Sequence, residues 1–388
     1  MTARPTIHVK PREGRRARAG APWLFSNEIE MPAKTLAPGA VVNVIGDDGR
    51  VFGTGAFNAK SLIAVRLLDP AADVAIDAAF LATKLKRALA LRETFYRAPF
   101  YRLVNAEGDG LPGLTIDRFA DTIVVQISTA GMEALLEPLL TALGETLHPA
   151  HIVLRADAPA RALEGLDSYV RAGEAGRITV EENGVRYFAD VAAGQKTGWY
   201  YDQRDNRAFI ASLSGGKSVL DAYCYSGGFA LGAARAGAKE VAGLDSSAPA
   251  LALAEDGAAA NDLKANFVKT DVFEELERLW AAREKFDVVV ADPPPFVKAK
   301  KDLEAGAKAY RKLARLAASV TAPAGLLLLA SCSHNIAAER FAQECAAGIA
   351  RAGRIARLIR QSGAPCDHPI HPMLPESAYL KALVYALD

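Results

Sequence analysis

The pattern of apolar and polar positions divides the 388 residues of the chain into three parts. In residues 1–70, short apolar runs are separated by turn residues, and this pattern predicts a small β-rich domain. The strands expected in this part cover 40–46, 51–57 and 61–68. Asp47-Asp48-Gly49 lies between the first two strands and is typical of a hairpin turn.

Residues 71–190 combine both periodicities and are predicted to form a mixed α+β domain. Apolar residues recur at helical spacing from Ile76 to Phe95, and Pro99 ends this helix. The other elements expected are strands at 101–106, 114–118, 122–127 and 151–155, a helix at 131–147 and a hairpin at 177–189 with Asn183-Gly184 at its tip. Glu107 and Asp109 lie in a glycine-rich turn, where a structural role is favoured, so no catalytic group is expected in this part.

Residues 191–388 alternate predicted strands and helices, which indicates an α/β domain with a parallel sheet. The expected strands are 217–221, 240–245, 266–270, 286–291, 324–331 and a last, antiparallel one at 378–386. The expected helices are 203–213, 228–236, 247–261, 272–283, 303–321 and 335–351. Ligands bind beyond the carboxyl ends of the strands in such sheets, so the residues that follow each strand form the candidate site.

The first strand–loop–helix–strand unit of this domain has the pattern of a nucleoside-binding site. Its first strand ends at Asp221, a loop of small residues follows from Tyr223 to Gly228, and its second strand ends at Asp245. An acid after the second strand accepts hydrogen bonds from two ribose hydroxyls in such sites. The dinucleotide fingerprint G-x-G-x-x-G is absent from the sequence of this loop. Asp221 would repel a pyrophosphate but attract an ammonium group, which favours S-adenosylmethionine; an ordinary Rossmann-type nucleotide site stays open.

The later strand tips carry further candidate groups. Asp271 follows the third strand, where it suits either an adenine amino group or the N-cap of the next helix. Asp292-Pro-Pro-Pro-Phe296 follows the fourth, and its prolines hold the Asp carboxylate in a rigid loop, with Phe296 as a stacking face for a base. Cys332 follows the fifth, where a nucleophilic role is favoured over that of a small buried apolar residue. All five tips are expected along one edge of the sheet.

The segment from Gly194 to Arg207 is dense in polar and aromatic residues. Such a segment suits closure over a cofactor, and it equally suits a domain-boundary turn that caps the helix expected at 203–213. Both interpretations stay open on chemistry alone.

Composition and charge exclude some classes of protein. The net charge is +1, so global charge does not indicate a nucleic-acid partner, and the longest clean apolar run, 325–330, is too short to span a membrane. Four cysteines without disulfide or zinc-finger spacing fit a reducing cytoplasm, and the prolines around Cys366-x-His368-x-x-His371 argue against a metal site. The basic run in 4–18 suits either a solvated tail or an RNA-docking rim beside the β-rich domain.

Taken together, several motifs resemble one family. GQKTGWYYDQRDNR, DAYCYSGGF, GLDSS, DPPPF, SCSH and DHPIHPMLPESAYLK are similar to segments of the RlmI-type large-subunit ribosomal RNA cytosine-C5 methyltransferases. KPREGRRARAGAPWLFSNEI resembles the PUA RNA-binding domain of that family, and RLVNAEGDGLPGLTIDRFADTIVVQ resembles its central α+β domain. The resemblance covers nearly the whole chain and implies a PUA-like domain at 1–70, an α+β domain at 71–190 and a Rossmann-like class I methyltransferase domain at 191–388.

The resemblance also implies a cofactor, site residues and partners. The cofactor is S-adenosylmethionine, the partner is large-subunit (23S) ribosomal RNA, and dimers in the family hint at a homodimer. The implied cofactor-binding residues are Lys196, Thr197, Tyr200, Gln203, Arg204, Asp221, Tyr223, Tyr225, Ser226, Gly227, Phe229, Asp245, Ser246, Asp271 and Asp292. The implied RNA-binding residues are Lys10, Arg12, Arg15, Arg16, Pro293, Pro294 and Phe296.

In the mechanism that the resemblance implies, Cys332 is the nucleophile and Asp292 binds the base. A thiolate attacks C6 of cytosine so that C5 can accept a methyl group, and the base is unstacked to enter the pocket. Many other RNA cytosine-C5 methyltransferases carry a second Cys where this chain has Pro294, so a two-cysteine release is not available here. The alternatives are methylation of a guanine nitrogen, a non-enzymatic RNA-binding protein and a nicotinamide oxidoreductase.

Overall fold

The computed structural model describes residues 4–33, 35–173, 175–194 and 197–388, which form two compact units. Unit 1 contains the residues up to Ile178 together with Asp190–Trp199 and Cys366–Ser377. Unit 2 contains Thr179–Ala189, Tyr200–Pro365 and Ala378–Asp388. The predicted three-part division of the chain stays a prediction. Among the described helices, none combines the length and the apolar composition that crossing a membrane requires.

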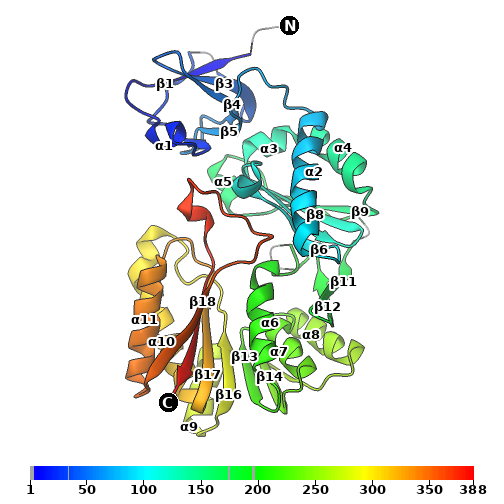
Figure 1. Cartoon of the computed structure of the whole chain (residues 1–388), viewed down its shortest axis with the longest axis vertical. Coiled ribbons are helices and arrows are strands. Elements are labelled where there is room, and N and C mark those ends of the chain that lie inside the picture. The colour runs from blue at the N-terminus through cyan, green and yellow to red at the C-terminus, as the bar shows by residue number, and fades with distance from the viewer. Residues whose placement is uncertain (1–3, 34, 174, 195–196) are drawn as a thin grey trace. The chain divides into compact units, whose positions relative to one another are not determined.

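Unit 1 begins with a five-stranded sheet in the order β1-β3-β4-β5-β2 (Figure 1). Its elements are β1 (Thr6–Val9), α1 (Arg15–Arg18), β2 (Trp23–Leu24), β3 (Ala40–Gly46), β4 (Val51–Phe57) and β5 (Val65–Asp69). The strands expected at 40–46 and 51–57 are confirmed, whereas the third begins at Val65 and not at residue 61. β1 escaped prediction because it has only four residues and becomes a strand by parallel pairing with β3.

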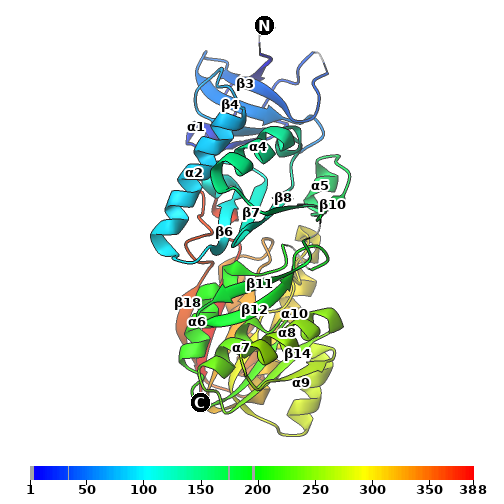
Figure 2. The same cartoon turned by 90° about the vertical axis from the view of Figure 1, so that its right-hand side faces the viewer.

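A second five-stranded sheet of unit 1 has the order β10-β9-β8-β7-β6. Its strands are β6 (Phe100–Asn105), β7 (Leu114–Phe119), β8 (Thr122–Ile127), β9 (His151–Ala156) and β10 (Tyr169–Arg171). The helices here are α2 (Ala78–Phe95), α3 (Ala130–Ala134), α4 (Leu136–Leu147) and α5 (Ala160–Leu163), with the 3-10 turn η1 (Ala106–Asp109). α2 and α4 pack their apolar faces on this sheet (Figure 2). The single helix expected at 131–147 is two helices that break at Leu135.

The two acids of the glycine-rich turn have structural roles, as expected. Asp109 forms a bidentate ion pair with Arg92, which is fully buried, and the closer N–O distance is 2.6 Å. Glu107 accepts a hydrogen bond from the indole N–H of Trp23 at 2.9 Å, which links this turn to the N-terminal sheet.

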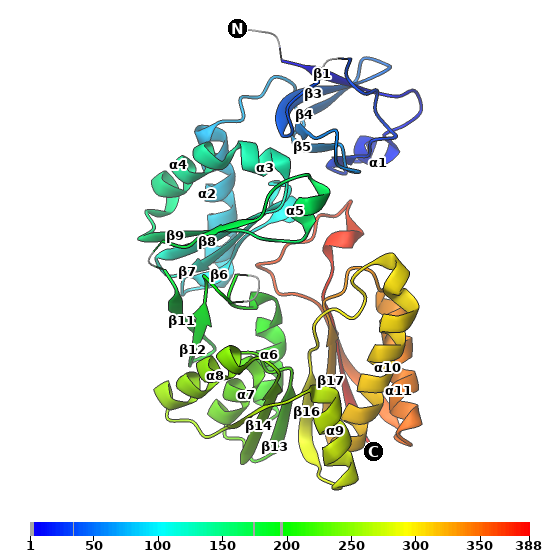
Figure 3. The same cartoon turned by 180° about the vertical axis from the view of Figure 1, so that it is seen from behind.

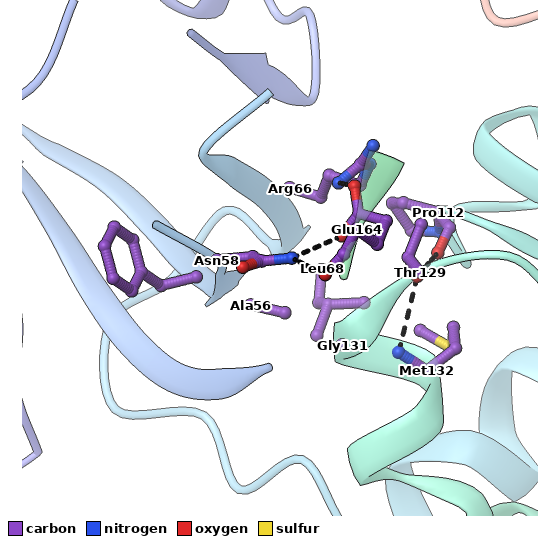
Figure 4. A pocket seen from close by; sticks show the side chains of 10 residues that line it. Ala56, Asn58, Arg66, Leu68, Pro112, Thr129, Gly131, Met132 and Glu164 are labelled. Atoms are coloured by element: carbon purple, nitrogen blue, oxygen red, sulfur yellow. Dashed lines mark hydrogen bonds and ion pairs between the residues drawn. The ribbon is translucent and has the colours of Figure 1, made fainter. Parts of the chain in front are cut away.

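The two sheets of unit 1 are joined by a buried carboxylate, Glu164 (Figure 4). Its Oε1 accepts from the Ser61 hydroxyl at 2.6 Å and pairs with Arg66 at 2.9 Å, and its Oε2 accepts from Asn58 Nδ2 at 2.8 Å. Burial alone would raise the pKa of Glu164, but the bond from Ser61, the charge of Arg66 and the bond from Asn58 together lower it. The cavity beside Glu164 measures only about 10 Å³, so this junction is packed and offers no room for a ligand.

Unit 2 is a seven-stranded sheet in the order β15-β14-β13-β16-β17-β19-β18. Its strands are β13 (Ser218–Ala222), β14 (Glu240–Asp245), β15 (Asn266–Lys269), β16 (Phe286–Ala291), β17 (Thr321–Ser331), β18 (Ala356–Ser362) and β19 (Lys381–Leu387). The first five pair in parallel, as predicted, and β19 is the expected antiparallel strand. β18 was missed because it is an edge strand with mostly exposed side chains, so it lacks an apolar pattern.

Helices cover both faces of this sheet. They are α6 (Arg204–Ser212), α7 (Gly228–Arg235), α8 (Ala248–Ala260), α9 (Val272–Ala281), α10 (Leu303–Val320) and α11 (Ala338–Arg351), with 3-10 turns η2 (Tyr201–Gln203) and η3 (Lys300–Asp302). α9, α10 and α11 lie together on one face (Figure 3), and α6, α7 and α8 lie on the other (Figure 1). Alternate residues of β16 point to opposite faces of the sheet. Val289 packs in the core under α9, α10 and α11, and Val288 packs in the core under α6 and α7.

The hairpin β11 (Arg177–Glu182) and β12 (Val185–Asp190) is fixed to α6 by a buried ion-pair cluster. Asn183 and Gly184 form its tip, as predicted, and both have positive φ. The side chain of Glu182 is 1 % exposed and pairs with Arg207 at 2.6 Å and with Arg204 at 3.3 Å. This cluster holds the hairpin beside the segment that leads into the first strand of the sheet.

We expect Glu182→Gln to destabilise the protein by about 3–5 kcal/mol, because it removes the charge of a buried carboxylate that pairs with two buried guanidinium groups. Denaturant unfolding of the full chain measures this change. Glu277→Gln is the control, since the Glu277–Lys312 pair is half exposed and such pairs contribute about 0–1 kcal/mol. Equal changes in the free energy of unfolding for the two substitutions would show that the Glu182 cluster stabilises the fold no more than an exposed ion pair does.

Candidate active site

The carboxyl ends of β13, β14, β15, β16 and β17 lie along one edge of the unit 2 sheet. Their register fixes this alignment, since Ala222 at the end of β13 is opposite Leu244 of β14 and Ala291 of β16. The polar residues that follow each strand are therefore neighbours, as the sequence predicted. The glycine loop, Asp245, Asp271, the Asp292 loop and Cys332 all come from this edge.

The loop between β13 and α7 is a tight turn with unusual backbone angles. Tyr223 and Tyr225 have φ of 67° and 49°, and Gly227, which precedes α7, has φ of 79°. Side chains other than glycine rarely adopt positive φ, and such residues concentrate at ligand-binding sites. Cys224 is buried between the two tyrosines, and its N–H donates to Leu244 O at 2.9 Å, which ties the loop to β14.

Asp245 connects this loop to the next strand tip. Its Oδ2 accepts from the backbone N–H of Tyr225 at 2.9 Å, and its Oδ1 accepts from the N–H of Ser247 at 2.9 Å. The carboxylate is therefore oriented at the mouth of the loop, and Ser246 next to it is exposed. The geometry suits recognition of a ribose by oxygen acceptors whose positions are fixed beforehand.

Asp221 is a buried carboxylate with one free oxygen. Its Oδ2 accepts from the N–H of Ala230 at 2.9 Å, while its buried Oδ1 has no hydrogen-bond partner among the described residues. The hydroxyl of Ser226 is likewise buried without a partner in the part of the chain that the structure describes. Burial, together with the negative charges of Asp292 and Asp245, raises the pKa of Asp221 to about 7. A ligand cation would satisfy this oxygen, so the site fits the ammonium group of S-adenosylmethionine.

Three tyrosines surround the acids. Tyr200 packs edge-on against Tyr225 with 5.3 Å between ring centroids. Burial raises the pKa of Tyr200, and so do Tyr225, Asp202, Cys332 and Asp292, which shows that it lies among these groups. Burial likewise raises the pKa of Tyr223, and Asp271 and Asp245 add to this effect. The hydroxyls of Tyr200 and Tyr223 therefore stay protonated and are able to donate hydrogen bonds.

Asp292 is oriented by an amide. Its Oδ2 accepts from Gln203 Nε2 at 2.9 Å, and Gln203 Oε1 in turn accepts from Asn206 Nδ2 at 2.7 Å. Gln203 and Asn206 come from η2 and α6, so the segment before β13 reaches the fourth strand tip. Of the two interpretations of the segment from Gly194 to Arg207, this contact favours closure over the site rather than a turn that only caps α6.

The Asp292 loop and the Cys332 loop are joined through Tyr310 of α10, which sequence reasoning missed. The buried hydroxyl of Tyr310 accepts from Ser331 Oγ at 2.8 Å and shares a hydrogen bond of 3.0 Å with Ser333 Oγ. It also accepts from the N–H of Phe296 at 3.4 Å. Residues on both sides of Cys332 are thus linked to the loop that carries Asp292. The sequence indicated only that this Tyr lies on the apolar face of a helix. That position suits ordinary core packing as well as a link between two loops.

Lys381 at the start of β19 was also missed. Its Nζ donates to the carbonyl oxygen of Ser333 at 2.5 Å, next to Cys332. Burial lowers the pKa of Lys381, and the charge of the Cys332 thiolate acts against this change, so the two groups interact electrostatically. β19 pairs with β17 so that Lys381 is opposite Ser331, a proximity that only the sheet register reveals.

Other predicted residues have structural contacts in addition to, or in place of, the expected ones. Asp271 caps α9 through bonds from Phe273 and Glu274, the alternative kept open above. Arg204 pairs with Glu182, and the ring of Phe229 is buried in the core. Phe296 packs against Tyr310 with 4.8 Å between ring centroids. The base-stacking role of Phe296 stays a prediction.

Further residues fall outside this cluster. Thr197 belongs to unit 1, where its hydroxyl donates to Asp117 at 2.5 Å, and Lys196 lies outside the described residues. Pro293 is buried and Pro294 exposed. In the N-terminal domain, Arg12 and Arg15 are exposed, Lys10 donates to Asn27 O, and Arg16 pairs with Glu376 at 3.0 Å. Their contact with RNA stays a prediction.

Comparison with known proteins identifies two family matches. Residues 7–70 match a PUA-like domain, and residues 142–386 match the S-adenosylmethionine-dependent methyltransferase family. The crystal structure of the methyltransferase SMU.776 complexed with SAH superposes with a TM-score of 0.85 over 98% of this chain and 100% of that one. The two are 21% identical, so this likeness shows the fold alone. The predicted fold class, a Rossmann-like methyltransferase domain after a PUA-like domain, is confirmed, and so is the cofactor, S-adenosylmethionine.

Two relatives are similar over nearly the whole chain. "Ribosomal RNA large subunit methyltransferase I" of Shewanella denitrificans is 39% identical over 97% of this chain and 98% of that protein. The protein of the same name from Aeromonas hydrophila is 39% identical over 94% of each. The chain belongs to the ribosomal RNA large subunit methyltransferase I family of S-adenosylmethionine-dependent methyltransferases.

Proposed function

We propose that this protein methylates C5 of a cytosine in large-subunit ribosomal RNA through a covalent adduct between Cys332 and C6. Family membership supports the RNA class, because the relatives are named for it. The observation that carries the C5 chemistry is the link through Tyr310 between the Cys332 and Asp292 loops, with Lys381 beside the thiol. A thiol beside a cation at a strand tip suits a nucleophile.

In this proposal, each part of the cofactor has its own residues. S-adenosylmethionine, when bound, supplies an electrophilic methyl group. Asp221 and Ser226 hold its ammonium group, because both have buried oxygen atoms without partners among the described residues. Asp245 binds the ribose and Asp271 the adenine amino group. Tyr200, Tyr223 and Tyr225 surround the other parts of the cofactor.

The reacting groups of the protein act on the base. The Cys332 thiolate bonds to C6, and the electron pair that this displaces makes C5 nucleophilic toward the methyl group. Asp292, oriented by Gln203, accepts a hydrogen bond from the exocyclic amine and gives a proton to N3, which neutralises the negative charge that the thiolate brings onto the ring; N3 returns this proton when the thiolate leaves. Loss of the C5 proton then expels the thiolate and restores the aromatic ring. Pro294 occupies the place of a second cysteine, so a base other than a thiol at that position takes the proton.

Nucleoside mass spectrometry tests the proposed function. Purified protein is incubated with S-adenosylmethionine and unmodified large-subunit ribosomal RNA, and the RNA is digested to nucleosides. New 5-methylcytidine is the expected product. A methylated guanosine in its place would overturn the cytosine assignment and remove Cys332 from the reaction.

We expect Cys332→Ala to abolish formation of 5-methylcytidine while the affinity for S-adenosylmethionine, measured by calorimetry, stays within about 2-fold, because the thiol acts only on the base. The wild type should also form a covalent adduct with RNA that contains 5-fluorocytosine. Cys366→Ala is the matched control and should keep full activity, since Cys366 is exposed and lies in unit 1. Methylation by the Cys332→Ala variant would disprove the covalent route.

The raised pKa of Asp221 predicts that cofactor affinity depends on pH. The ammonium group binds the ionised carboxylate, so affinity should fall about tenfold per pH unit below about pH 7. Calorimetry between pH 5 and 9 measures this change. Asp221→Asn should bind the cofactor more weakly and without this dependence, and the exposed Asp262→Asn is the control.

Thermal unfolding provides an independent test of the same residue. The folded-state pKa of Asp221 lies above its ordinary value of 3.8, so its contribution to stability decreases as the pH rises from about 4 to about 7. Without cofactor at pH 8, Asp221→Asn should therefore unfold at a higher temperature than the wild type. A lower unfolding temperature would indicate a purely structural carboxylate.

We expect Lys381→Met to raise the pH at which Cys332 becomes reactive by about 1 unit or more, because a neighbouring cation favours the thiolate. Alkylation with iodoacetamide, followed by mass spectrometry of the peptide that contains Cys332, gives the pH profile. Lys381→Arg keeps the charge and should keep the profile near that of the wild type. A merely structural Lys381 would leave the profile unchanged in both variants.

A further inference from the structure

A basic groove lies on the outer face of unit 2. It is lined by Lys308, Arg311, Lys312 and Arg315 of α10 and by Arg351 at the end of α11, and its volume is about 390 Å³. All five lining residues are cationic, in a chain whose net charge is only +1. The charge is therefore concentrated here by the fold, which calls for an anionic partner.

The spacing of these residues explains why they share one face. Positions 308, 311, 312 and 315 follow the i, i+3, i+4, i+7 pattern of a helix surface. The opposite face of α10 is buried in the core through Tyr310, Leu313, Ala314 and Ala317. From Lys308 to Arg315 the helix rises about 10 Å, so the cations form a row and not a single point of charge.

Close packing of α10 against α11 brings Arg351 to the same groove. A Cβ atom at Gly348 would lie 2.4 Å from the carbonyl oxygen of Arg311 and 2.6 Å from the Cβ of Ala314. Only glycine allows this approach, so α11 lies directly against the backbone of α10 (Figure 3). The long basic side chains of both helices are displaced to the solvent side of the contact.

The cations of the basic groove are only partly neutralised. Arg311 pairs with Glu344 at 2.5 Å and Lys312 with Glu277 at 3.0 Å. Lys308 and Arg351 are exposed and have no ion pair among the described residues. Arg315 lies 5.7 Å above the ring of Trp280, which is 50% exposed and offers an aromatic face at the end of the row.

The helix that lines the basic groove follows the candidate active site in the chain. α10 begins directly after the loop that carries Asp292, and Lys308 lies about 8 Å along the helix from its first residue. The intervening loop adds the exposed cations Lys298, Lys300 and Lys301. Between positions 297 and 315 the sequence has seven Lys or Arg residues against two acids, Asp302 and Glu304. A strand whose base entered the active site would thus meet a row of cations next to it.

We propose that the basic groove binds phosphates of the RNA strand that flanks the methylated nucleotide, with Trp280 available to stack on a flanking base. This inference rests on the proposed RNA substrate. The row of cations, its continuity with the Asp292 loop and the exposed aromatic ring favour a single-stranded RNA over an acidic protein. Contacts to phosphate fix position and register, and base recognition stays with the active site.

The test compares three variants of the full chain by filter binding of unmodified large-subunit ribosomal RNA over a range of salt concentrations. The groove variant is Lys308→Ala/Lys312→Ala/Arg315→Ala. The control Arg235→Ala/Lys239→Ala/Lys264→Ala removes the same number of positive charges from the other face and edge of the sheet. A third variant, Lys308→Arg/Lys312→Arg/Arg315→Lys, keeps every charge.

The groove variant should bind the RNA at least about tenfold more weakly, and the slope of log K against log salt should fall by about 2, at roughly 0.7 per lost phosphate contact. The control and the charge-keeping variant should bind like the wild type. Affinity for S-adenosylmethionine, measured by calorimetry, should be equal in all variants, which verifies folding of the site.

Wild-type affinity and slope in the groove variant would overturn the inference, and so would an equal loss in the control variant. These outcomes are separate from failure of the proposed function, because RNA binding is measured without reference to the product. If the wild type forms no 5-methylcytidine but the groove variant alone loses affinity, the cytosine assignment fails and the basic groove stands.

Discussion

The main constraint at the candidate active-site edge of the sheet is electrostatic, because several carboxylates lie together in a small, partly buried volume. Asp221, Asp245 and Asp292 lie close enough for their charges to raise the pKa of Asp221. Backbone N–H groups and the Gln203 amide satisfy most of their oxygens, which offsets part of the cost of burial. Asp221 Oδ1 is buried without a hydrogen-bond partner among the described residues, and in our proposal the ammonium group of the cofactor supplies that partner. The strain of positive φ at Tyr223 and Tyr225 is stored in the same loop.

A second constraint is that the two sides of α10 have different roles. Its inner side carries Tyr310, which links the loop that contains Cys332 to the loop that contains Asp292. Its outer side carries the cations of the basic groove. In our proposals, one helix therefore connects the chemistry to the contact with the RNA backbone. A change in the packing of α10 would affect both.

Much of the fold follows from the sequence because its signals are local. The parallel strands of unit 2 are continuous apolar runs that end in polar residues, and this pattern alone identified the edge where the candidate groups meet. The Asn183-Gly184 tip acts on its own backbone, so it too was predicted correctly. Where the signal is not local, prediction failed. β1 and β18 are short or exposed and become strands only through pairing with a neighbour.

By itself, the sequence determined most of the order of elements, the methyltransferase fold and the residue types at each strand tip. Only the tertiary structure decided which of those residues have partners. It showed that Arg204 is neutralised by Glu182, that Tyr310 joins two loops from different strands, and that Lys381 lies beside Cys332. These contacts join residues 14 to 48 positions apart, and sheet register and helix packing set them. The sequence specifies which chemical groups are present. The hydrogen bonds, burial and charges that distant segments supply determine which of these groups have partners within the protein.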